Sequence, residues 1–339
     1  MAVAAVACSG LLIAASLTAW ARWPESEYHC SVSEKLAEAR QQRLAEPAAL
    51  FDWSGLIVPR EQVISGGVPK DGIPSITDPQ FAPAASQTQW EGDARVVGVV
   101  VGDKARAYPL AMLNRHEIVN DTLGGTPIAV VFCPLCDSVS VVDRRPPGEG
   151  EDVEPLEFGV SGMLMNSNVL LYDRTHDALW SQVAMTAMTG PYAGQFLRHL
   201  GGWSLGPLSA FTDANPDATV MVVDEAVQSQ YARNVYADRG YFEDEQVWFP
   251  YASDDNRLSV KEPILGLHRD GQTWAFPLEA WSGHAGPVRH AFADGAEAVF
   301  EFGGDREVAV ASLPEDADAV HTFWFAWVSF NPQTQVVLP

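Results

Sequence analysis

Two cysteines, Cys133 and Cys136, have the residue type and the spacing that most clearly allow chemistry in this sequence. They lie in VVFCPLCDSVSVVD, between two runs of β-branched residues. A Cys-x-x-Cys pair can be a redox dithiol, half of a metal–thiolate site, or two structural thiols. In thioredoxin-like proteins the first cysteine begins a helix, whereas strand-like alternation follows the second cysteine here. A turn between two strands that aims both sulfurs at one point is typical of a metal-binding knuckle, and it supplies half of a tetrahedral zinc site.

His116, in NRHEIVND, is the first candidate for a further ligand. Two thiolates and one imidazole suit copper(I), and an imidazole also ligates zinc. We therefore predict an exported protein that binds copper(I) or zinc through Cys133, Cys136 and His116, for delivery, storage or sensing of the ion. Glu117, beside the histidine, would support the site from outside the ligand set.

Two alternatives from other functional classes remain open. In a thiol–disulfide oxidoreductase, Cys133 would attack, Cys136 would resolve the mixed disulfide, and His116 would help to deprotonate the attacking thiol. In a binding module for a partner protein, the two cysteines would form a structural disulfide. The sequence does not decide whether the protein is an enzyme.

The stretch NSNVLLYDRTHDALWSQ contains Asp173, Arg174 and Gln182. Its simplest interpretation is a turn between two strands that an Asp–Arg pair holds together. The alternative is that these three residues line a pocket or support the cysteine site.

Other potential ligands lie outside these motifs. Cys30 and His29 could complete a metal site, although an unpaired thiol or a crosslink is an equally good interpretation of Cys30. Methionine sulfur binds copper but is also a common filler of hydrophobic cores. The candidate methionines are Met163, Met165, Met185 and Met188.

The elements that would position these residues are mostly strands. Alternating and β-branched patterns predict strands over residues 116–121, 126–132, 137–143 and 156–162, and a hairpin over 96–110 that turns at Gly102-Asp103. HTFWFAWVSF, residues 321–330, is interpreted as a buried strand. Short helices are predicted over residues 110–115, 192–200 and 208–214.

One segment recurs without a gap: GVVVGDKARAYPL at residues 98–110 and GLHRDGQTWAFPL at residues 266–278. The tripeptide EFG also occurs twice, at 157–159 and 301–303. We predict an α+β, predominantly β fold of antiparallel sheets with an internally repeated hairpin unit and a few short helices. Residues 51–339 would form a single β-rich domain of two related units, about 90–225 and 260–339, and only the first unit has the cysteine pair.

Composition limits the partners. Forty-four acidic residues against 21 basic ones give a net charge of −23, which argues against nucleic-acid binding. Residues 1–21 have no charged side chain and end in Ala19-Trp20-Ala21, which indicates a signal peptide or a membrane anchor. Residues 22–50 would form a helical spacer. We thus expect an exported, periplasmic or otherwise extracytoplasmic protein that meets the membrane only through its N-terminal segment. Oligomeric state is left open.

Several motifs occur in an order that is similar to a known family. They are GGVPKDGIPSITDPQF, ARAYPL, HEIVNDTLGGTPIAVVFCPLC, FGVSG, NSNVLLYDR, LWSQ and FWFAW. From about Asp52 to the C-terminus the chain resembles domain-of-unknown-function family 3179. The resemblance implies an exported or membrane-anchored prokaryotic protein, and it implies no activity. It places His116, Glu117, Cys133 and Cys136, together with Asp173, Arg174 and Gln182, inside the shared motifs. Asp137 departs from the small residue expected after the second cysteine.

Overall fold

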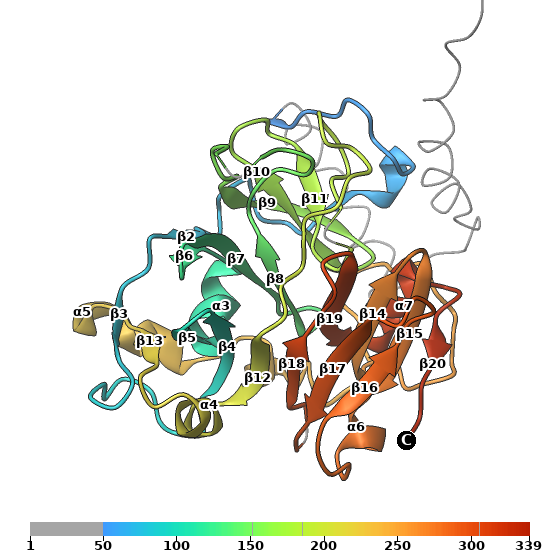
Figure 1. Ribbon diagram of the computed structural model, residues 1–339. Helices are drawn as coiled ribbons and strands as arrows, with labels where there is room; N and C mark the ends of the chain where they lie inside the picture. The colour runs from blue at the N-terminus through green and yellow to red at the C-terminus, as the bar shows by residue number, and fades with distance from the viewer. Residues whose placement is uncertain (1–49, 151, 185, 305) are drawn as a thin grey trace, which may run out of the picture.

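The computed structural model describes residues 50–150, 152–184, 186–304 and 306–339 (Figure 1). Strands dominate this part of the chain, so the predicted α+β, predominantly β class is confirmed. The expected leader, Cys30 and His29 lie outside the described residues, as does the spacer apart from its last residue. No helix within the described ranges is both long and apolar enough to cross a bilayer.

The repeated segment forms the same structure twice. Each copy is an antiparallel hairpin followed directly by a helix: β4 (Arg95–Val101), β5 (Lys104–Pro109) and α3 (Leu110–His116), then β14 (Pro263–Arg269), β15 (Gln272–Pro277) and α6 (Leu278–Trp281). The register is also the same, because Gly98 pairs with Ala107 and Gly266 with Ala275. In both copies a proline precedes the helix, where its fixed φ and missing N–H cost nothing.

Two further strands complete each hairpin in the same way. They flank a helix: β12 (Trp203–Pro207), α4 (Leu208–Ala214) and β13 (Thr219–Met221), and β19 (Ala317–Phe323), α7 (Trp324–Phe330) and β20 (Gln335–Val336). β12 and β19 run antiparallel to β4 and β14, whereas β13 and β20 run parallel to β5 and β15. The result is two four-stranded cores of equal topology.

Each unit also sends three strands into the sheet of the other. They are β6 (Ile118–Leu123), β7 (Thr126–Cys133) and β8 (Ser138–Asp143), and β16 (Val288–Ala291), β17 (Glu297–Phe302) and β18 (Val308–Ser312). β8 pairs with β19, and β18 pairs with β12. With β2 (Ile76–Thr77) and β3 (Phe81–Pro83) at the edges, two eight-stranded sheets arise. Neither sheet belongs to one unit alone.

A third, smaller sheet lies beside these two (Figure 1). It contains β1 (Ile64–Ser65), β9 (Phe158–Met165), β10 (Asn168–Asp173) and β11 (Leu179–Ser181). The connection between β13 and β14, residues 222–262, has only short helices: α5 (Glu225–Gln228), η3 (Ser229–Ala232) and η4 (Ala237–Arg239). Another short helix, η2 (Arg60–Gln62), precedes β1.

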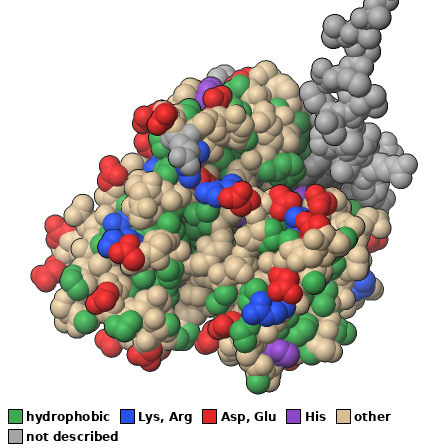
Figure 2. Space-filling view, in the orientation of Figure 1, with side chains coloured by type: hydrophobic (Ala, Val, Ile, Leu, Met, Phe, Trp, Pro, Cys, Tyr) green, Lys and Arg blue, Asp and Glu red, His purple; other side chains and the backbone are tan. Residues whose placement is uncertain are grey.

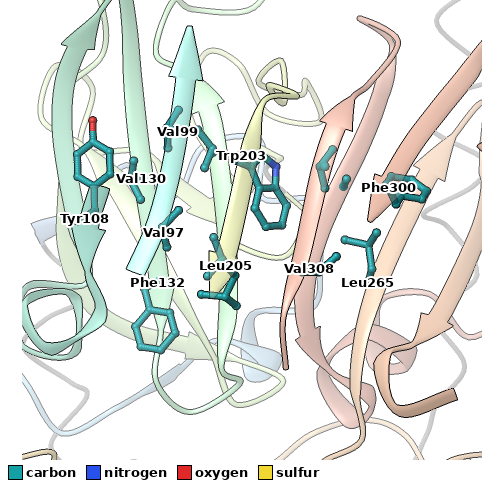
Figure 3. Packing of buried hydrophobic residues seen from close by; sticks show 14 of the residues in the cluster. Val97, Val99, Tyr108, Val130, Phe132, Trp203, Leu205, Leu265, Phe300 and Val308 are labelled. Carbon is teal, nitrogen blue, oxygen red and sulfur yellow. The ribbon is translucent and has the colours of Figure 1, made fainter. Parts of the chain in front are cut away.

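The two large sheets share one hydrophobic core. Figure 3 shows side chains of both sheets packed together, among them Val97 and Trp203 of one sheet and Phe132 and Leu265 of the other. All four are almost completely buried. Burial of apolar surface on this scale is the main stabilising contribution to folding, and here it couples the two units.

Three predictions about elements were wrong. Residues 192–200 form turns and single bridges instead of a helix, with Gly194 in the left-handed region at φ 80°. The predicted strand over 321–330 ends at Phe323, and α7 follows, because a helix buried on all sides has no polar face to reveal its period. The two EFG tripeptides are not equivalent, since the first overlaps the start of β9 and the second the end of β17.

Candidate functional site

The two cysteines lie on the turn that joins β7 to β8. Cys133 is the last residue of β7 and pairs with Ser138, the first residue of β8. The N–H of Cys136 donates to the carbonyl of Cys133 at 3.2 Å, and Asp137 closes the turn in the left-handed region at φ 47°. Both cysteines are completely buried and unbridged.

The two thiols have unequal acidity. Burial alone would raise the pKa of Cys133, but hydrogen bonds from the Cys136 side chain and from the N–H groups of Val169, Cys136 and Leu135 outweigh it and lower the pKa. The pKa of Cys136 is raised by burial, by its hydrogen bond with Cys133 and by the negative charges of Cys133 and Asp137. Cys133 is therefore the more acidic thiol of the pair, and Cys136 is the less acidic one.

A network of buried hydrogen bonds contacts Cys136. Asn168 Nδ2 donates to Cys136 Sγ at 3.7 Å and to Gln182 Oε1 at 2.8 Å, and Ser138 Oγ donates to the same Gln182 oxygen at 2.6 Å. The carbonyl of Ser167, 3.3 Å from Cys136 Sγ, is a second acceptor for its S–H. Gln182 thus belongs to the surroundings of the cysteine turn without contacting a sulfur itself.

Glu117 lies next to Cys133. It caps the end of α3 at φ 58°, its N–H donates to Leu113, and its carbonyl accepts from the N–H of Phe132 at 2.8 Å. Burial and, to a smaller extent, the negative charge of Cys133 raise the pKa of Glu117 to about 8. The carboxyl group is consequently protonated at neutral pH and can donate a proton.

His116 makes its contacts elsewhere. Its Nδ1 lies 2.7 Å from the carbonyl oxygen of Pro74, and its Nε2 lies 2.9 Å from the hydroxyl oxygen of Tyr231. Burial lowers the pKa of His116, so the ring is neutral at physiological pH. Within the described ranges, no three His, Cys, Asp or Glu side chains converge as a metal-binding group. The copper or zinc centre stays a prediction.

Asp173 stabilises the turn between β10 and β11, and Arg174 links this turn to a distant segment. Asp173 accepts hydrogen bonds from the backbone N–H of His176 at 2.7 Å and from the indole of Trp180 at 2.9 Å. Arg174 forms an ion pair with Asp71 at 2.9 Å. Asp173 thus holds the turn, whereas Arg174 pairs with a carboxylate outside the stretch, and a supporting or pocket role for the two residues stays a prediction.

Three of the four candidate methionines are buried, and Met185 lies outside the described residues. Met163, Met165 and Met188 belong to one hydrophobic cluster. Of these three, Met163 also lines a pocket beside the cysteine turn.

A pocket of about 330 Å³ lies against the cysteine turn. Glu117, Leu135 and Val169 line it, and the last two are the residues whose N–H groups face Cys133. Some of its lining residues come from β9 and β10, and others come from the connection between β13 and β14. The other lining residues are Gly66, Val68, Ile73, Val160, Gly162, Met163, Leu164, Leu170, Val235, Tyr236, Arg239, Trp248 and Phe249.

The residues of this connection were not among the predicted site residues. Tyr236, Arg239, Trp248 and Phe249 line the pocket, and Tyr241 donates from its hydroxyl to the carbonyl of Leu135 at 2.8 Å. Burial and the charges of Glu117 and Cys133 raise the pKa of Tyr236, which places its hydroxyl near both groups. The signal was the aromatic content of YFEDEQVWFPY, residues 241–251, within an acidic stretch.

Asp137 fixes the turn from its other side. Arg95 donates to the Asp137 carboxylate at 2.8 and 3.0 Å, and His321 Nε2 lies 3.4 Å from it. Burial would raise the pKa of Asp137, but Arg95 and His321 hold it well below the usual range. The departure noted in the sequence is thus a buried anion that ties the cysteine turn to β4 and β19.

These features define a β-rich protein with a buried Cys-x-x-Cys dithiol beside an apolar pocket. A family model described as "Protein of unknown function (DUF3179)" matches residues 70–317, and the chain belongs to this family. The comparisons with curated proteins and with solved structures found no match.

Proposed function

We propose that the protein is a thiol–disulfide oxidoreductase in which Cys133 attacks and Cys136 resolves. The unequal acidity of the two thiols supports this proposal above all. A thiolate is the form that attacks a disulfide, and the N–H groups and the S–H that face Cys133 favour its thiolate. Cys136, the less acidic thiol beside it, is suited to the second step.

Each step has a donor or an acceptor for its proton. The Cys133 thiolate attacks one sulfur of a substrate disulfide, the S–S bond breaks, and the departing thiolate takes the proton of Glu117. Cys136 then gives its proton to the Glu117 carboxylate and attacks Cys133, which forms the protein disulfide and releases the second thiolate. That thiolate takes the proton from Glu117. The substrate gains two electrons and two protons, and an external dithiol restores the reduced pair.

The pocket supplies the route to the sulfur. Cys133 has no exposed surface, but its neighbours Glu117, Leu135 and Val169 line the pocket. The reaction therefore requires the Leu135 and Val169 side chains to part when substrate enters.

Trapping tests the proposal in a chain that carries Cys8→Ser and Cys30→Ser, so that only the pair can react. We expect Cys136→Ser to accumulate a mixed disulfide with cystamine and Cys133→Ser to form none, as read by mass spectrometry. The unchanged pair should cycle between dithiol and disulfide in glutathione buffers. Equal trapping by both variants, or a pair that does not cycle, would contradict the proposal.

A metal–thiolate centre is the second candidate. The hydrogen bond between the two sulfurs brings them together, and soft thiolates select copper(I). Metal analysis of anaerobically purified protein, together with thiol titration, separates the two functions. Stoichiometric copper or zinc that is lost in Cys133→Ser would favour this candidate. If His116→Ala alone also loses the metal, His116 is a ligand. A metal-free dithiol favours the oxidoreductase.

A further inference from the structure

The walls of the pocket are built for an apolar ligand. Its aromatic side comes from Tyr236, Trp248 and Phe249, and the rings of Tyr236 and Trp248 stack at 5.6 Å. Val160 and Leu164 from β9 add aliphatic side chains to the lining. Small-molecule sites have volumes from roughly 300 to 1,000 Å³, so a pocket of about 330 Å³ suits a compact ligand.

Arg239 brings a positive charge to this apolar pocket. Arg239 lines the pocket and is also exposed to solvent. It lies 5.7 Å from the ring of Trp248, and no ion pair joins it to a carboxylate within the described part of the chain. Among the other lining residues, Glu117 has the only carboxyl group, and this group is protonated at neutral pH and adds no charge.

The rest of the surface makes this cation unusual. The chain has a net charge of −23, and Figure 2 shows acidic side chains scattered over the visible face. Such a surface repels anions. Many arginines of this chain are paired with carboxylates, as Arg233 is with Asp238 at 2.9 Å in the same connection. A guanidinium beside an apolar pocket, with no carboxylate partner among the described residues, therefore offers a local site for an anion.

We infer that the pocket binds a compact substrate with an apolar body and an anionic group, and that Arg239 holds the anion. This inference rests on the proposed function, because the disulfide of the substrate must then face Cys133. The class is an aromatic or aliphatic disulfide with a carboxylate or a sulfonate. Arg239 acts here as a specificity residue and takes no part in electron transfer.

Dye binding tests the ligand class without any redox step. Anilinonaphthalene sulfonate is an apolar anion, and N-phenylnaphthylamine is a similar molecule without the charge. In the Cys133→Ser protein, we expect Arg239→Gln to weaken binding of the sulfonate about tenfold, the usual effect of losing one charge-assisted hydrogen bond. Binding of the neutral dye should stay unchanged. Arg233→Gln is the matched control, since it removes the same charge from the same connection outside the pocket.

Reduction of two chromogenic disulfides tests the same class in the reaction. With Cys133 and Cys136 intact, Arg239→Gln should slow reduction of dithiobis(nitrobenzoate) about tenfold and leave that of neutral dithiodipyridine unchanged. If both disulfides and both dyes respond equally to Arg239→Gln, the inference is wrong, even where the dithiol works. If the dyes discriminate but neither disulfide is reduced, the ligand class stands and the oxidoreductase fails. Circular dichroism of each variant checks that it is folded.

Discussion

Glu117 shows how one buried carboxyl group can serve the site at the expense of stability. Its pKa is raised from 4.5 to about 8, chiefly by burial. Between these two values the folded chain holds a proton that the unfolded chain has released. Stability linked to Glu117 is therefore full below about pH 4.5 and falls as the pH rises to about 8. The shift corresponds to at most about 5 kcal/mol.

Glu117→Gln should remove this pH dependence, because an amide of the same shape does not titrate. We expect the variant to be more stable than the parent chain by up to about 5 kcal/mol near pH 9, and the difference to shrink towards pH 5. Urea unfolding at several pH values measures it. Glu301→Gln, at an exposed position of β17, is the control and should leave the change of the free energy of unfolding with pH as it is in the parent chain. A variant that keeps the slope of the parent chain would show that Glu117 is ionised in the folded state at neutral pH.

Chemistry at the residue level could be predicted only where one local motif contains it. The spacing of Cys133 and Cys136 pointed to thiol chemistry, and Glu117 and Gln182 were named from neighbouring motifs. The role assigned to His116 could not be tested from the sequence, because which way its ring turns depends on Pro74 and Tyr231, distant in the chain. Tyr236 and its neighbours were missed because a long connection brings them to the pocket, and no periodic pattern marks such a contact.

At the level of elements, the repeated glycines explain why the two hairpins have the same sequence pattern. Each leaves room for an aromatic ring from the helix that covers its strand. A Cβ built on Gly98 would lie 2.2 Å from the ring of Phe211 in α4, and one on Gly266 would lie 2.5 Å from the ring of Trp327 in α7. The repeated glycine thus allows a helix to pack closely on each hairpin. That helix follows much later in the chain than the hairpin.

Gly98→Ala and Gly266→Ala should each destabilise the protein by about 3 kcal/mol, because a buried ring must move to admit the methyl group. Gly206→Ala in β12 is the matched control. Its Cβ would meet only Glu307 at 3.6 Å, an ordinary contact, and we expect a change below about 1 kcal/mol. Chemical denaturation measures all three. Equal effects at the three positions would show that the rings do not fix these strands.

The elements also show why some secondary structure escaped prediction. The hairpin over 96–110 and the helix over 208–214 were correct, since proline, glycine and alternation are local signals. The helix α7 was wrongly predicted as part of a strand, because every residue from Trp324 to Phe330 is buried and the sequence of this helix lacks a polar face. The exchange of strands between units depends on pairings between distant segments, which one sequence does not reveal.

At the level of the whole molecule, strand exchange makes the two units inseparable. β16, β17 and β18 follow the second hairpin but extend the sheet of the first, and the site turn on β7 and β8 extends the sheet of the second. The ion pair of Arg95 with Asp137 crosses between these sheets directly behind the cysteines. The position of the dithiol therefore depends on both units.

This arrangement predicts that a chain cut after α6 stays together. Residues 282–287 are exposed, and nothing lies within 4 Å of a Cβ built on Gly286, so a protease site inserted after Ala285 should be tolerated. The C-terminal fragment would hold strands of both large sheets: β16 to β18 in one, and β19 and β20 in the other. We expect the two fragments to elute together in native buffer, to keep the thiol reactivity of the uncut protein, and to separate in urea. If they part in native buffer, each sheet is stable without the strands of the other unit, and the dependence of the cysteine turn on both units is wrong.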